Sequence, residues 1–272
     1  MARVRKEFVP DERAGHAARK IVLFSAHGSG TRPDLFELRV FLLGIGGFSP
    51  EEVSRETRIF LDLSMETMTA VRLTGSTDTE GFPAAEMWDK APPIRFDRDW
   101  QGKNPDPERA TEVRVTWAPE TLYLRFIVRF RTITVFGDAE PNGRRDHLWD
   151  RDVAETFLQP PELSGPHYRE IEVSPNNYWI DLDIAPGGKR DLQSGLARRT
   201  AIDRSSMIWR AELALPMKSL TARFSPDKTW RANFYRVEGA EEPRFYSAWR
   251  ATNTAVPNFH VPEAFGTLAF ES

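Results

Sequence analysis

The chain has 272 residues, of which 40% are hydrophobic and 28% are charged, and its formal net charge is −3. This composition is typical of an ordinary soluble globular protein, and so small a charge does not favour nucleic acid as a partner. The absence of cysteine excludes disulfides, thiolate metal sites and cysteine nucleophiles, and no apolar run approaches the roughly 20 residues that a membrane-spanning helix needs.

The first part of the chain, residues 1–61, shows no pattern that defines a domain. Its basic start is followed by an apolar stretch at 21–26 that is too short for the core of a signal peptide, so no clear signal peptide is predicted. Gly44, Gly46 and Gly47 follow an apolar run, but the third glycine of a dinucleotide-binding fingerprint and the helix after it are missing. We expect residues 1–61 to be a poorly defined N-terminal extension and residues 69–272 to form one domain.

From residue 71 onward, short runs of alternating apolar and polar residues are separated by turn-forming residues. Val113, Val115 and Trp117 share one face of a predicted strand, and Ala118-Pro-Glu120 makes a turn into the next alternating run, 122–130. This pattern predicts a β-hairpin. Further strands are predicted at 152–158, 168–173, 178–184, 208–215, 230–237, 245–249 and 265–270.

Together these segments predict an all-β protein. The breaks between them, such as 174–177, 185–188 and 216–219, are rich in proline, glycine, asparagine and serine, so no parallel βαβ crossover is needed. About ten short strands suit an antiparallel β-sandwich of the immunoglobulin or jelly-roll type.

The segment 148–159 holds the first candidate binding residues. In a strand from 152 to 158, Glu155 shares a face with Val153 and Phe157, where a solvated carboxylate is not expected. A carboxylate on an apolar face needs a partner, which can be a sugar hydroxyl, an arginine or a cation. Trp149, six residues earlier, offers a flat apolar face to a sugar ring. The alternative is that Glu155 is a structural carboxylate and Trp149 a core or edge aromatic.

The second candidate segment is the long loop from 248 to 266. Trp249, Asn258, Phe259 and His260 combine ring surfaces with hydrogen-bonding groups, the mixture that a polyhydroxylated ligand requires. The alternative is a packed Ω-type loop whose aromatic residues pin it to the sandwich.

Three segments carry a resemblance to a known family. They are Trp-Asp-x-Asp-Val-x-Glu-x-Phe at 149–157, Tyr-Arg-Glu-Ile-Glu-Val-Ser-Pro-Asn at 168–176, and Pro-Asn-Phe-His-Val-Pro-Glu-Ala-Phe-Gly-Thr-Leu at 257–268. The chain from about Gly81 to Ser272 resembles carbohydrate-binding module family 9 (CBM9), a group within the DOMON-type sandwiches that includes xylanase-associated modules. In those modules two aromatic residues sandwich a terminal sugar, and polar groups hold its hydroxyls.

The resemblance implies a role for particular residues of this chain. Trp149 is similar to the first aromatic wall, and Glu155 to the carboxylate that binds the sugar. Arg169 is the nearest basic candidate for the family's arginine. The second wall is expected in the last loop, at Phe259 or alternatively Trp249, with Asn258 as the neighbouring amide; His260 has no clear counterpart.

The resemblance also implies a metal ion, a ligand, a partner protein and a cellular location for such a module. Relatives carry structural calcium, and oxygen donors for it are available, but alternating carboxylates on a strand are also typical of a solvated face, so no metal ligand is assigned. The implied ligand is a xylan-like or cellulose-like polysaccharide or the end of an oligosaccharide, a glycoside hydrolase is an implied partner in polysaccharide catabolism, and the location is implied to be extracytoplasmic. The calcium donors considered are Asp150, Asp152, Asp181 and Asp183.

Two other functions stay open at this stage. A glycoside hydrolase needs two tuned carboxylates on either side of the scissile bond, and only Glu155 lies where its pKa is expected to be perturbed. Binding of b-type haem, the other occupation of DOMON-type sandwiches, would need ligands such as Met87, Met207 or Met217, none of which stands in a recognisable haem motif. We therefore expect a binding module rather than an independent catalyst.

Overall fold

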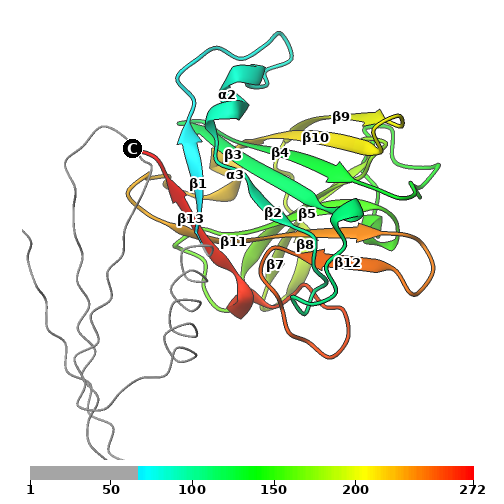
Figure 1. Cartoon of the computed structure of the whole chain (residues 1–272). Helices are drawn as coiled ribbons and strands as arrows, with labels where there is room; N and C mark the ends of the chain where they lie inside the picture. The colour runs from blue at the N-terminus through cyan, green and yellow to red at the C-terminus, as the bar shows by residue number, and fades with distance from the viewer. Residues whose placement is uncertain (1–66) are drawn as a thin grey trace, which may run out of the picture. The chain divides into compact units, whose positions relative to one another are not determined.

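The computed structural model describes residues 67–272, and in this range the chain folds into a β-sandwich of two layers (Figure 1). The predictions for residues 1–61 lie outside the described residues. The first layer contains β2 (Ile94–Phe96), β3 (Thr111–Ala118), β4 (Thr121–Arg129), β10 (Ile208–Pro216) and β9 (Ala197–Asp203).

The second layer carries the site described below. Its strands are β5 (Val153–Gln159), β6 (Tyr168–Val173), β7 (Trp179–Ala185), β8 (Gly188–Asp191), β11 (Trp230–Glu238), β12 (Phe245–Ala248) and β13 (Gly266–Phe270). The strand β1 (Thr67–Arg72) joins the two layers, because it pairs with β13 through its first half and with β3 through its second. Helical turns are short: α2 (Ala85–Lys90), α3 (Met217–Leu220) and the 3₁₀ turns η1 (Pro107–Arg109), η2 (Leu148–Asp150) and η3 (Pro262–Ala264).

The predicted all-β sandwich is confirmed, with most strands antiparallel. The hairpin at Pro119-Glu120 forms as expected, with Ala118 paired to Thr121. Two features differ from the prediction: both pairings of β1 are parallel, and β1, β2, β8 and β9 were not among the predicted strands. The last two are edge strands made largely of exposed residues, so they carry no alternating apolar signal.

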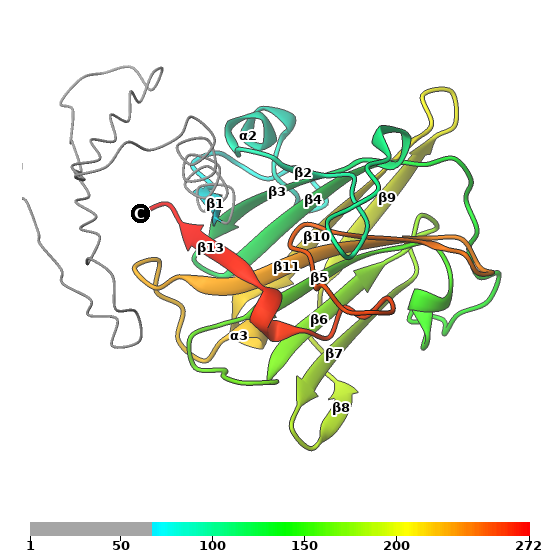
Figure 2. The ribbon, with the colours of Figure 1, turned by 60° about the horizontal axis from the view of Figure 1, so that its bottom comes forward.

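The layer that contains β5, β6 and β11 is covered on both faces. Its inner face packs into the main core of the sandwich through residues such as Ala154, Ile171 and Phe234. Its outer face carries a second apolar cluster, which includes Phe157, Tyr168, Tyr235, Phe259 and Phe265. In Figure 2 the orange-red segment that leads into β13 crosses in front of these strands. The strands are buried on both faces because this C-terminal segment covers the outer one.

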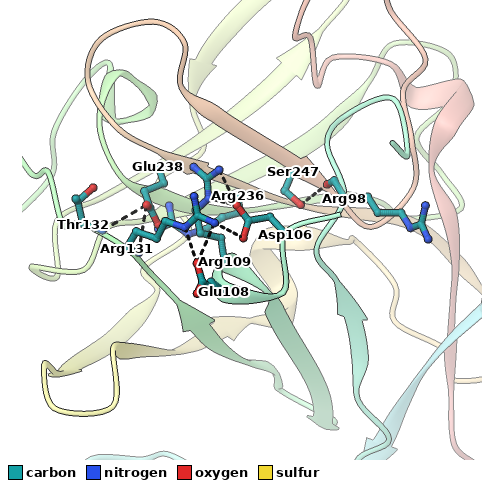
Figure 3. A network of polar contacts seen from close by, with 9 residues as sticks. All are labelled: Arg98, Asp106, Glu108, Arg109, Arg131, Thr132, Arg236, Glu238 and Ser247. Carbon is teal, nitrogen blue, oxygen red and sulfur yellow. Dashed lines mark hydrogen bonds and ion pairs between the residues drawn. The ribbon is translucent and has the colours of Figure 1, made fainter. Parts of the chain in front are cut away.

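A buried polar network fixes the start of β5 and the end of β11, and Figure 3 shows its part around Arg236 and Glu238. The side chain of Arg236 is fully buried, and its Nη2 atom lies 3.2 Å from Glu238 Oε2 and 3.7 Å from Asp152 Oδ2. Asp152 also accepts a hydrogen bond from the backbone N–H of Gly239. Burial raises the pKa of both carboxyls, and the nearby Arg236 opposes that rise. The network ties β5 to β11 three residues before Glu155.

Candidate functional site

Glu155 lies on the outer face of the second layer. As the alternation predicted, it shares that face with Val153 and Phe157, which belong to the outer cluster, whereas Ala154 and Leu158 face the main core. Its side chain is only 3% exposed. The carboxylate therefore sits in an apolar layer beneath the C-terminal segment.

Two more glutamates lie beside it on the neighbouring strand. Glu172 is directly opposite Glu155 in the antiparallel register, and Glu170 lies two pairs further along, opposite Phe157. Glu172 is fully buried and Glu170 is 3% exposed. One carboxylate oxygen from each of the three residues lies within 4.8 Å of the others. We call these three residues the glutamate cluster.

Burial and mutual repulsion perturb the ionisation of the glutamate cluster. Burial is the largest cause that raises the pKa of Glu155 and of Glu172 well above the usual range, and their neighbouring carboxylates add to it. Burial also raises the pKa of Glu170. Arg244 opposes the shift at Glu155, and Lys189 opposes it at the other two. Such a concentration of perturbed carboxyls in one place is typical of functional sites.

The glutamate cluster forms the floor of a cleft with a volume of about 240 Å³. Basic and aromatic side chains surround it, and the loop before η3 closes one side. The lining residues are Trp149, Glu155, Glu170, Glu172, Leu182, Lys189, Val237, Arg244, Tyr246, Pro257, Asn258, Phe259 and His260.

Trp149 stands at the rim of the cleft because of the turn η2. The preceding residue, Leu148, is fully buried in the outer cluster and anchors the turn, while Trp149 is half-buried. Arg244 Nη1 donates a 2.8 Å hydrogen bond to the carbonyl oxygen of Trp149, and Lys189 Nζ lies 4.3 Å from the centroid of its ring. The indole is thus held in place with part of its surface turned to the cleft.

The last loop both packs on the sandwich and lines the cleft. Phe259 is 8% exposed and stacks on Tyr235 at 4.2 Å between ring centroids, and the Tyr235 hydroxyl donates to its carbonyl oxygen. Asn258 is exposed at the rim, and its Oδ1 accepts a hydrogen bond from the backbone N–H of His260. Tyr235 covers much of the ring of Phe259. The half-buried Tyr246 is therefore, after Trp149, the second aromatic residue whose ring is available to a ligand in the cleft.

Two residues implied by the resemblance lie away from the cleft. Arg169 points to the inner face of the sheet with Ile171 and pairs there with Asp183, because neighbouring residues on a strand face opposite sides. Trp249 packs against Phe234, at 5.7 Å between centroids, beside the main core. Neither lines the cleft.

The basic groups that do line the cleft are Arg244, Lys189 and His260, and the first two were not predicted. Glu170 and Glu172 were also missed, although a signal for them was present. In the predicted strand they lie on the same face as the apolar Tyr168. A carboxylate on an apolar face is the same signal that identified Glu155.

The aspartates considered as calcium donors do not come together. Asp152 belongs to the network of Arg236, and Asp183 pairs with Arg169, His167 and Arg190. Asp181 accepts a hydrogen bond from the backbone N–H of Ser194, and the half-buried Asp150 lies 3.8 Å from His147. Among residues 67–272, the glutamate cluster is the group whose oxygens are close enough to share a metal ion.

One sheet of this two-layer β-sandwich carries a cleft with aromatic walls and a polar floor. This is the architecture of a small-ligand binding module. The comparisons with known proteins match part of the chain to one family. Residues 191–270 match the family model described as "Carbohydrate-binding family 9". The match confirms the resemblance, and it takes in β9 to β13 together with Tyr246, Asn258 and Phe259.

Solved structures confirm the fold over a longer part of the chain. A proposed carbohydrate-binding protein from Bacteroides uniformis superposes with a TM-score of 0.61 at 16% identity, over 75% of this chain and 99% of that one. A family 9 module from Caldicellulosiruptor kristjanssonii, solved with glucose and with cellotriose, gives a TM-score of 0.52 at 14% identity over 75% of this chain and 95% and 93% of those chains. Residues 67–272 therefore form a β-sandwich of the family 9 type.

One curated relative is similar in sequence. It is a protein from Arthroderma benhamiae named "Extracellular protein", which is 22% identical over 194 residues, or 65% of this chain and 85% of its own length. Within residues 67–272, no helix is long and apolar enough to span a membrane.

Proposed function

We propose that the chain binds carbohydrate in the cleft between Trp149 and the last loop. The observation that carries the proposal is the pairing of a half-buried indole at the rim with the buried carboxylate of Glu155 on the floor. A sugar ring presents C–H groups on its faces and hydroxyls at its edge, so stacking on Trp149 leaves hydroxyls to donate to Glu155. The family model that matches the C-terminal part and the sugars bound to a module of the same fold support this function.

The size of the cleft favours the end of a glycan over its middle. Sites for drug-sized ligands occupy about 300–1,000 Å³, and the cleft, at about 240 Å³, is smaller. It suits one or two sugar rings. We propose the terminal residues of cellulose-like or xylan-like chains as ligands, and an extracytoplasmic location in polysaccharide catabolism beside a glycoside hydrolase; the extracellular relative supports the location.

The arrangement of the carboxylates favours binding over hydrolysis. A glycosidase places its two carboxyls on either side of the scissile bond, about 5–10 Å apart. Here the three glutamates lie side by side on two adjacent strands of one floor, within 4.8 Å of each other. The haem alternative gains no support either, since Met87 and Met217 are buried and Met207 is outside the cleft lining.

The proposal is tested by isothermal titration calorimetry with cello- and xylo-oligosaccharides and with their borohydride-reduced forms. We expect saturable binding to the wild-type chain and at least tenfold weaker binding to the reduced sugars. Glu155→Gln should weaken binding by roughly 10- to 150-fold, because a hydrogen bond to a charged group contributes about 1.5–3 kcal/mol.

The matched control is Asp181→Asn. It also neutralises a buried carboxylate of the same sheet, but on the inner face, where Asp181 is paired with Ile171. It should leave the affinity unchanged. If no oligosaccharide binds the wild-type chain, the proposed function is wrong.

A further inference from the structure

The glutamate cluster brings three buried carboxyls together, and the basic groups nearby compensate their charge only in part. Like charges directly opposite each other on paired strands are unfavourable, and an ionised carboxylate that is buried without a partner is more so. Neither oxygen of the fully buried Glu172 has a hydrogen-bond partner, and Oε2 of Glu170 has none. These unpartnered oxygens belong to side chains that line the cleft.

The basic residues at the rim contact other groups or Glu170, and none forms an ion pair with Glu172. Lys189 is exposed and lies over the ring of Trp149. Arg244 binds the carbonyl oxygen of Trp149 and the carboxylate of Glu242. His260 Nδ1 lies 3.8 Å from Glu170 Oε2 and 2.5 Å from the hydroxyl of Tyr168. The floor of the cleft therefore still lacks a direct counter-ion for Glu172.

The spacing of the oxygens fits a hard cation. Calcium binds oxygen ligands at about 2.3–2.6 Å, so two ligands on opposite sides of one ion are up to roughly 5 Å apart. The three glutamates offer oxygens that all lie within 4.8 Å of one another. Strands β5 and β6 hold them in register, so the donor set is formed by the folded sheet itself.

We propose that Glu155, Glu170 and Glu172 bind one calcium ion on the floor of the cleft, and that this ion contributes directly to sugar binding. Calcium takes six to eight oxygen ligands, and three side chains on one side leave positions open toward the cleft. Two adjacent hydroxyls of a sugar ring that stacks on Trp149 can fill them. This part of the inference rests on the proposed function, whereas the ion site itself does not.

The first experiment measures the ion without any sugar. The full-length chain is treated with a chelator, dialysed and titrated with calcium chloride at pH 7.5 by calorimetry. We expect one ion per chain, and at calcium concentrations about 100-fold above its dissociation constant the melting temperature should rise by roughly 5–10 °C.

Glu172→Gln should abolish both the binding heat and the rise in melting temperature. The variant keeps the shape of the side chain and removes one buried charge. The control Asp181→Asn should bind calcium as the wild-type chain does, because its carboxylate lies on the other face of the sheet. The site is refuted if wild-type protein does not bind calcium, which is the result expected when the glutamates share a proton instead. It is also refuted if Glu172→Gln binds calcium as well as the wild-type chain does.

The second experiment separates this inference from the proposed function. The affinity of the chain for the oligosaccharide is measured once in saturating calcium chloride and once in excess chelator. We expect a loss of at least tenfold in chelator for the wild-type chain and an equal loss for Glu172→Gln in calcium. If wild-type protein binds the sugar equally well in chelator, the role of the ion in sugar binding is refuted while carbohydrate binding stands.

Discussion

Replacing Arg236 with methionine should lower the free energy of unfolding by about 3–5 kcal/mol, because it leaves buried carboxylates without their cation. Asp152 and Glu238 lie 3.7 and 3.2 Å from its guanidinium and are almost completely buried. Urea unfolding at pH 7.5, followed by circular dichroism, measures the loss.

The loss at position 236 should depend on pH in a defined direction. Burial already raises the pKa of Asp152 and of Glu238 above the values of the unfolded chain, and removing the cation raises both further. A carboxyl whose folded pKa is raised binds its proton more readily in the folded state, so stability increases as the pH falls through that pKa. The deficit of Arg236→Met should therefore be largest near neutral pH and shrink in mild acid.

Arg131→Ala is the control for this network. Arg131 also pairs with a carboxylate, Asp106, but its side chain is 51% exposed, and an exposed pair contributes at most about 1 kcal/mol. Equal losses for the two variants, or none for Arg236→Met, would contradict the role of the buried network in holding β5 to β11.

Replacing Trp149 with alanine should weaken oligosaccharide binding by roughly 5- to 150-fold, since an aromatic ring that stacks on a flat ligand contributes about 1–3 kcal/mol. The fold should persist, because the anchor of the turn is the buried Leu148 and the indole is only half-buried. Calorimetry gives the affinity, and the melting temperature shows that the variant is folded.

Trp179→Ala is the matched control. Trp179 is also half-buried and has a cation near its ring, Arg198 at 5.1 Å, but it packs against the main core on the inner side of the sheet. Its loss should cost some stability and leave the affinity unchanged. If Trp149→Ala binds as tightly as the wild-type chain, the sugar does not stack on Trp149.

The sequence predicts the sandwich because its central strands alternate between core and outer positions, as β3 and β4 do. The same parity argument places Glu155 on the outer face. It places Glu170 and Glu172 there too and Arg169 on the inner face, where Arg169 pairs with Asp183 and does not line the cleft. A shift of one residue on a strand moves a side chain to the other face of the sheet.

Other parts of the site depend on tertiary contacts that the sequence does not encode locally. That Glu172 lies opposite Glu155 follows from the register of β5 with β6, which no local pattern gives. Arg244 and Lys189 reach the cleft from loop and edge positions whose polar residues carry no periodic signal. Phe259 lines the cleft, but much of its ring surface is covered by the buried ring of Tyr235.

The most direct test of carbohydrate binding in this cleft is a crystal structure of the chain grown with cellotriose or xylotriose in the presence of calcium. We expect a terminal sugar ring against Trp149, with hydroxyl oxygens within about 3 Å of Glu155 or of an ion held by the glutamate cluster. A sugar bound at another surface, with Trp149 and the three glutamates free of it, would contradict the proposed site.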